Sequence, residues 1–190
     1  MIWRHRGVDI PLEIYHGVPA GWSADEIFAE HKALSGTFPI DDFKIGKWAA
    51  PSWMTQRFEW LRYRQTLLRV ADGVRAHDAA CVEIAIRYIC LRHIGSKSGF
   101  IRGKLARSLK TAVLTDEQKK RLNRHFLEIV RQRDYTQEFH EYSKLWEQII
   151  DTHCLNAVVA HFGQHHPDGS GDGVSRPWVA GLIRAFDQRS

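Results

Sequence analysis

Lysine and arginine recur at helical spacing in the middle of the sequence. Residues 87–133 hold 13 Lys/Arg and three Asp/Glu, whereas the remaining residues hold 14 and 19. A cationic surface of this kind attracts polyanions, because Lys and Arg neutralise phosphates and release their counterions. The residues expected to contact nucleic acid are Lys97, Lys104, Arg107, Lys110, Lys120, Arg121, Arg124 and Arg131.

All but Lys97, which stands just before the first helix, fall on two consecutive predicted helices, over about residues 100–113 and 116–133. They lie opposite an apolar stripe, made of Ile101, Leu105 and Leu109 in the first helix and Leu122, Phe126 and Ile129 in the second, with Arg121 at the edge of the polar face. The helices are joined by a few residues, so their polar faces can form one continuous strip. The amide groups at the start of the first helix, beside Lys97 and Ser98, would suit a phosphate.

The charge pattern therefore predicts a non-enzymatic nucleic-acid-binding protein that belongs to a larger complex. It does not separate DNA from RNA or single from double strands, and it does not specify the oligomeric state. One alternative is a helical protein-interaction module whose basic face docks an acidic protein partner.

A second alternative is an all-helical RNase that uses an Arg/His pair. Arg87 with His93, and Arg133 with His140, fit the loose Arg-x(4–6)-His pattern of RNases of the HEPN type. A chain with 18 arginines and 11 histidines produces such matches by chance. We therefore assign no catalytic residue and interpret Glu83 and Arg87, one helical turn apart, as a structural ion pair on a buried helix.

Metal-ligating residues are concentrated near the C-terminal end. His161 and His165 are four residues apart on one predicted helix, and residues 168–173 match the first half of a calcium loop. The histidines have no second ligand pair, and Val179 stands where the bidentate glutamate of a calcium loop would be. We predict neither a metal nor another cofactor.

The elements that position these residues are helical. We predict an all-α fold: a single bundle of about seven helices over residues 52–190, with a Trp-rich, partly extended N-terminal segment over residues 1–51 that contributes one more helix. The expected helices are residues 24–34, 53–70, 79–94, 100–113, 116–133, 135–150 and 153–165, and a last one from residue 176.

The helix over residues 79–94 is apolar almost all round, so we expect it at the centre of the bundle. Asp78 is its expected N-cap and Gly95 its expected C-cap. The residues that should be almost fully buried are Cys81, Ile84, Ile86, Tyr88, Ile89 and Leu91. Residues 1–22 should be extended or irregular, with an edge strand or a short hairpin.

Composition excludes several classes of protein. The 190 residues are 44% hydrophobic, which is ample for a core. No apolar run approaches the roughly 18 residues of a membrane span, and Asp9, Pro11 and Glu13 interrupt any signal-peptide core. The three cysteines show no CxxC pair and are expected to be free thiols in a reducing compartment. The sequence thus predicts a cytoplasmic protein that does not bind a membrane.

Overall fold

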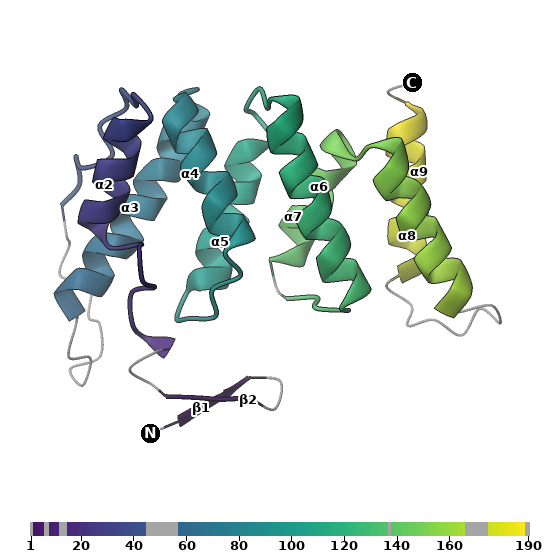
Figure 1. The fold of residues 1–190 in the computed structure, drawn as a ribbon, viewed down its shortest axis with the longest axis horizontal. Helices are drawn as coiled ribbons and strands as arrows, with labels where there is room; N and C mark the ends of the chain where they lie inside the picture. Colours follow the sequence, from purple (N-terminus) through teal and green to yellow (C-terminus); the bar gives the residue numbers. More distant parts are fainter. Residues whose placement is uncertain are drawn as a thin grey trace. The chain divides into compact units, whose positions relative to one another are not determined.

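The computed structural model describes residues 2–5, 8–11, 15–44, 57–136, 138–165 and 175–188. Within these ranges the chain forms one two-stranded hairpin and eight helices (Figure 1), which confirms the all-α fold class. The chain divides into two compact units, Met1–Val113 (unit 1) and Leu114–Ser190 (unit 2), so the predicted single bundle is not confirmed. The boundary predicted near residue 51 lies outside the described residues and stays a prediction.

Unit 1 begins with the hairpin. Strand β1 (Ile2–His5) pairs antiparallel with β2 (Val8–Pro11), and Ile2 lies opposite Pro11. Proline is compatible with the end of an edge strand, because no ladder partner needs its missing N–H. Across the hairpin Arg4 donates to Asp9 at 2.7 Å. Of the two forms expected for the N-terminal segment, an edge strand or a short hairpin, the structure has a hairpin, and its first strand is residues 2–5.

Four helices complete unit 1: α2 (Ala24–Ala33), α3 (Arg57–Arg75), α4 (Ala79–Cys90) and α5 (Ser98–Leu109). Helix α2 starts at a capping box, in which Ser23 and Glu26 bind each other's backbone amides. Helix α3 contacts α2, α4 and α5, and α4 also contacts α2 and α5. Trp22 packs edge-on against Tyr88 and so ties the segment before α2 to α4, and Trp60 is buried on α3.

Helix α4 lies in the core of unit 1. Cys81, Ile84, Ile86, Tyr88 and Ile89 are at most 1% exposed, as predicted. Leu91 is 39% exposed, so its predicted burial is wrong. The helix ends at Cys90 instead of Ile94: Leu91 is its C-cap and Arg92 adopts a left-handed conformation with φ 54°. Gly95 is therefore not the C-cap, and Leu91 lies beyond the last turn that packs inward.

Helix α3 also departs from its predicted bounds, because it continues through Gly73 to Arg75. A Cβ atom at Gly73 would lie 2.3 Å from the Cys81 sulfur. The glycine therefore lets α4 approach α3 closely without ending the helix. The predicted N-cap of α4 is confirmed, because Asp78 accepts the backbone N–H of Cys81 at 2.8 Å.

Unit 2 contains α6 (Asp116–Arg131), α7 (Phe139–Ile149), α8 (Thr152–His165) and α9 (Ser175–Asp187). Both α6 and α9 contact α7 and α8. Helix α6 starts at a capping box formed by Thr115 and Gln118. Its apolar stripe is buried against Trp146, whose indole donates to Asn123 Oδ1 at 2.7 Å.

No helix in the described part of the chain combines the length and the apolar character that crossing a bilayer requires.

Candidate functional site

The predicted cations of α5 surround its exposed side, which we call the α5 face: Lys97, Lys104, Arg107 and Lys110. Lys97 and Arg107 are exposed, and the other two are half-buried. The opposite stripe of Ile101, Leu105 and Leu109 is buried, as the amphipathic pattern predicts. Lys97 is also the N-cap residue, with φ 64°, and no side chain caps this helix start.

The second set of cations forms the α6 face: Lys120, Arg121, Arg124 and Arg131. All except the half-buried Arg121 are exposed. The stripe of Leu122, Phe126, Ile129 and Val130 is buried on the other side of the helix. Two acids, Asp116 and Glu117, stand in the first turn, where negative charge complements the helix dipole.

The two faces belong to different units, so one continuous strip across α5 and α6 stays a prediction. The charge itself is unequally divided. Unit 1 contains 17 Lys/Arg and 11 Asp/Glu, a balance of +6, whereas unit 2 contains 10 and 11, a balance of −1. Residues 84–115 contain seven Lys/Arg and no Asp or Glu. We call residues 84–115 the acid-free run. The cationic excess therefore centres on the end of α4, the following connection and α5.

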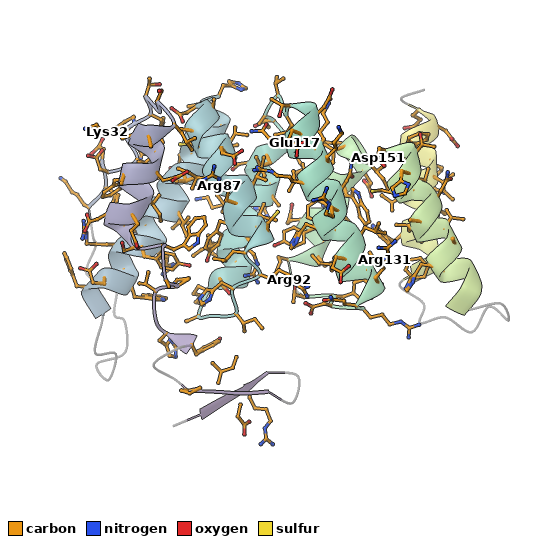
Figure 2. All side chains as sticks on the ribbon, viewed as in Figure 1. Lys32, Arg87, Arg92, Glu117, Arg131 and Asp151 are labelled. Carbon is orange, nitrogen blue, oxygen red and sulfur yellow. The ribbon has the colours of Figure 1, made fainter. Side chains whose placement is uncertain are left out.

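Arg87 and Arg102, two cations of that run, form hydrogen bonds inside unit 1. Arg87 donates to Glu83 Oε1 at 2.8 Å, which confirms the predicted ion pair, and also donates to Glu30. Arg87 is exposed, so the pair is not the buried one that the apolar helix suggested. Arg102 is buried and donates to the backbone oxygen of His93. Arg92 lies in the connection between α4 and α5 (Figure 2).

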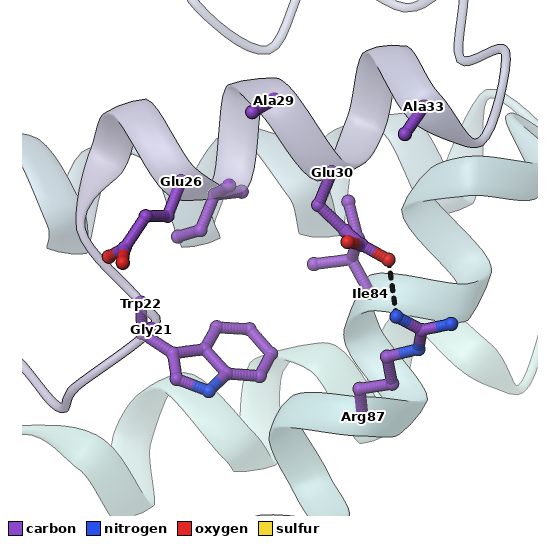
Figure 3. Close-up of a pocket in the computed structure, with 9 residues that line it drawn as sticks. Gly21, Trp22, Glu26, Ala29, Glu30, Ala33, Ile84 and Arg87 are labelled. Atoms are coloured by element: carbon purple, nitrogen blue, oxygen red, sulfur yellow. Dashed lines mark hydrogen bonds and ion pairs between the residues drawn. The ribbon is translucent and has the colours of Figure 1, made fainter.

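A pocket of about 550 Å³ opens between α2 and α4 (Figure 3). The Trp22 indole lines it, and Arg87 reaches Glu30 across it. Glu26 also lines the pocket, but its carboxylate is held by the amide and hydroxyl groups of Ser23. The lining thus offers two carboxylates and one guanidinium, a balance that disfavours phosphate. This part of unit 1 does not extend the α5 face.

The metal-ligating side chains that converge in the described residues are His31, Asp78 and Cys81, all buried, with ligand atoms within 4.8 Å of one another. The carboxylate of Asp78 is already occupied: it accepts from the amides of Cys81, Thr37 and Phe38, and lies 3.2 Å from His31 Nε2. Burial and the neighbouring Asp78 raise the pKa of the Cys81 thiol, so the thiolate needed by a metal is disfavoured. We assign this cluster a structural role.

A second buried polar cluster joins α3, α4 and α5. The hydroxyl groups of Tyr63 and Tyr88 share a hydrogen bond, and burial raises the pKa of Tyr63. Burial, together with the charge of Arg102, lowers the pKa of His93 to about 4. His93 is therefore neutral near pH 7, and a Cβ atom at Gly95 would lie 2.3 Å from its ring. The arrangement fixes the connection between α4 and α5.

The remaining candidate catalytic and metal-ligating residues belong to unit 2. Arg133, with φ 53°, and His140 are both exposed in unit 2. His161 is half-buried beside Phe162, whereas the side chain of His165 and the half calcium loop at 168–173 lie outside the described residues. All three cysteines are free, and Cys81 and Cys154 are buried, as expected.

Sequence reasoning missed three exposed apolar residues in the acid-free run, which we call the exposed apolar group. Leu91, Ile94 and Phe100 are 39%, 44% and 58% exposed. Phe100 precedes Lys104 by four residues and Arg107 by seven, so helical spacing places all three on one side of α5. That spacing was a usable signal, because it puts the aromatic residue with the cations and away from Leu105.

Comparison with known protein families, curated proteins and solved structures finds no match for this chain.

Proposed function

We propose that this protein is a non-enzymatic nucleic-acid-binding protein whose α5 and α6 faces contact phosphates. The observation that carries the proposal is the acid-free run of residues 84–115, which supplies all four cations of the α5 face. Lysine and arginine presented on a rigid helix, with no acid in the same stretch, neutralise successive phosphates and release their counterions. The uncapped start of α5 at Lys97 adds amide groups that complement an anion.

The α6 face supports the same function more weakly. Its exposed cations share a helix with Asp116, Glu117 and Glu128, and unit 2 as a whole has a balance of −1. The electrostatic field that attracts a polyanion follows from the summed charge as well as from the nearest side chains. We therefore expect the α5 face to contribute more to affinity than the α6 face.

The proposal is tested by fluorescence anisotropy with labelled DNA and RNA over a range of salt concentrations. Log Kobs against log salt should slope by about −0.9 per phosphate contacted on duplex DNA, or about −0.7 on single strands. Arg107→Glu should weaken binding to every sequence and reduce the slope by about one unit, and Arg124→Glu should do so to a smaller extent. The matched controls are Lys32→Glu and Lys144→Glu, which reverse exposed cations of the same two units away from these faces.

Two results would refute the proposal. One is the absence of nucleic-acid binding. The other is an affinity that stays unchanged when the charges of both Arg107 and Arg124 are reversed, in a variant whose far-ultraviolet circular dichroism spectrum matches that of wild type. Loss of a co-purifying acidic protein in the same variants, without any effect on nucleic acid, would favour the protein-docking alternative. Cleavage of RNA that stops on His93→Ala or His140→Ala would favour the RNase alternative instead.

A further inference from the structure

The exposed apolar group lies within the acid-free run. Leu91, Ile94 and Phe100 fall within ten residues of one another, and each is more than a third exposed. A single exposed apolar residue needs no explanation, but three within ten residues of the sequence do. The group is interleaved with Arg92 and Lys97, and Lys104 follows on α5.

Hydrogen bonds hold this group in place. Gly95 donates its N–H to Ser98 Oγ at 3.1 Å, and the Ser98 hydroxyl donates to Gly95 O at 2.8 Å. Buried Arg102 donates to the backbone oxygen of His93, and the amide of Ser96 donates to Tyr15 O at 2.6 Å. The connection is therefore tied to the first two turns of α5 and to the N-terminal segment. Phe100 itself lies in the first turn of the helix, so its exposure is built into the fold.

We propose that Phe100 is a stacking platform for an unpaired base, and that the α5 face binds single-stranded nucleic acid; this inference rests on the proposed function. Phenylalanine has no hydrogen-bonding group, so it cannot read base edges, but its ring can stack on any base that is not already paired. Lys97, Lys104 and Arg107 lie three, four and seven residues away from it and carry the charge that the sugar-phosphate backbone requires. In a duplex the base faces are covered by their neighbours, so the ring would gain nothing.

The test compares Phe100→Ala with wild type on single-stranded and duplex oligonucleotides of equal length, followed by anisotropy. Stacking of one base on an aromatic ring predicts a loss of about 5- to 150-fold for single strands. Duplex affinity should be unchanged, because the cations remain. Phe100→Trp should bind single strands about as tightly as wild type, because the indole ring can also stack on a base. The matched control is Phe58→Ala: Phe58 is 61% exposed on α3, outside the acid-free run, and its removal should change neither affinity.

An oligonucleotide with abasic positions separates stacking from charge. Wild type should bind the abasic strand as weakly as Phe100→Ala binds the intact strand. Phe100→Ala should bind the abasic and the intact strands with equal affinity. Single-strand binding that survives Phe100→Ala but falls with Arg107→Glu would overturn the inference and leave the proposed function standing. Absence of all nucleic-acid binding would overturn both. Sedimentation with anionic phosphatidylserine vesicles that depends on Phe100, with no binding to single strands, would assign the group to a membrane surface and also overturn the inference.

Discussion

Replacing Asp78 with alanine should lower the free energy of unfolding of unit 1 by about 3–5 kcal/mol. Its carboxylate is buried and accepts the amide of Cys81 at 2.8 Å, which caps α4. It also accepts the amides of Thr37 and Phe38 at 2.7 and 2.9 Å, and lies 3.2 Å from His31 Nε2. One side chain thus ties the end of α2 and the segment after it to the start of α4.

The magnitude follows from these contacts. Loss of an N-cap costs about 1 kcal/mol, and each buried donor left without an acceptor costs about 1–3 kcal/mol. Thr37 is exposed and Phe38 half-buried, so water can reach their amides in part, and the lower end of that range applies to each. Ser23→Ala is the matched control, because Ser23 caps α2 in the same unit at a more exposed position and should cost about 1 kcal/mol.

Urea unfolding followed by circular dichroism measures both variants. A loss on Asp78→Ala no larger than that on Ser23→Ala would refute the reasoning, because the carboxylate would then act as an ordinary cap.

The same carboxylate predicts a pH dependence. Burial by itself would raise the pKa of Asp78, but the amides of Cys81, Phe38 and Thr37 outweigh it and lower the pKa below its usual range. In the unfolded chain the pKa is about 3.9. The stability contributed by the ionised group is therefore complete above about pH 4 and is lost as the pH falls further. The difference in stability between wild type and Asp78→Asn should narrow below about pH 4; a constant difference down to about pH 2.5 would contradict this account.

Three further predictions use the same unfolding assay. Ile89→Ala should cost about 2–5 kcal/mol, because Ile89 is fully buried in α4, whereas Leu91→Ala, at an exposed position, should cost less than about 1 kcal/mol; equal losses would contradict the observed end of the helix. Asn123→Ala should destabilise unit 2 by about 2–4 kcal/mol, because it leaves the buried indole N–H of Trp146 without its acceptor. Asn123→Asp should not recover that loss, because its second oxygen would face Asp151 Oδ2 and Ile149 O, which now accept from the Asn123 amide. Because the pKa of His93 is lowered to about 4, from about 6.5 in the unfolded chain, unit 1 should lose stability between about pH 6.5 and pH 4, and His93→Gln should remove that part of the pH dependence.

Local capping signals in the sequence mark the starts of α2, α4 and α6. The capping boxes at Ser23 and Thr115 and the N-cap at Asp78 are all found, because each is formed by residues three apart in the chain. Helix ends were predicted less well. Gly73 resembles a helix breaker, yet α3 passes through it. The glycine is needed there because Cys81 of α4 packs against it, and the sequence around Gly73 does not reveal that tertiary contact. The division after Val113 is likewise a property of contacts between helices.

In the candidate site, too, local spacing predicted some features, whereas contacts between distant parts of the chain determine others. The outward position of Arg107 and Arg124 followed from amphipathic spacing, which depends only on the helix. The second partner of Arg87 did not, because Glu30 lies on another helix and is 57 residues away in sequence. Phe100 was overlooked because an aromatic residue is normally assigned to the core, although its spacing from Lys104 and Arg107 placed it with the cations.

Charge is unevenly distributed along unit 1. Arg62 pairs with Asp25, and both Arg69 and Arg75 pair with Asp72, while Arg87 in the acid-free run pairs with Glu83 and Glu30. Partly exposed pairs of this kind stabilise the fold by no more than about 1 kcal/mol each, but they cancel charge locally. From residue 84 to residue 115 the chain supplies cations and no acid. The balance of +6 therefore arises where α4 ends and α5 begins, which is also where Phe100 is exposed, so attraction of a polyanion and stacking on its bases would draw on the same few residues.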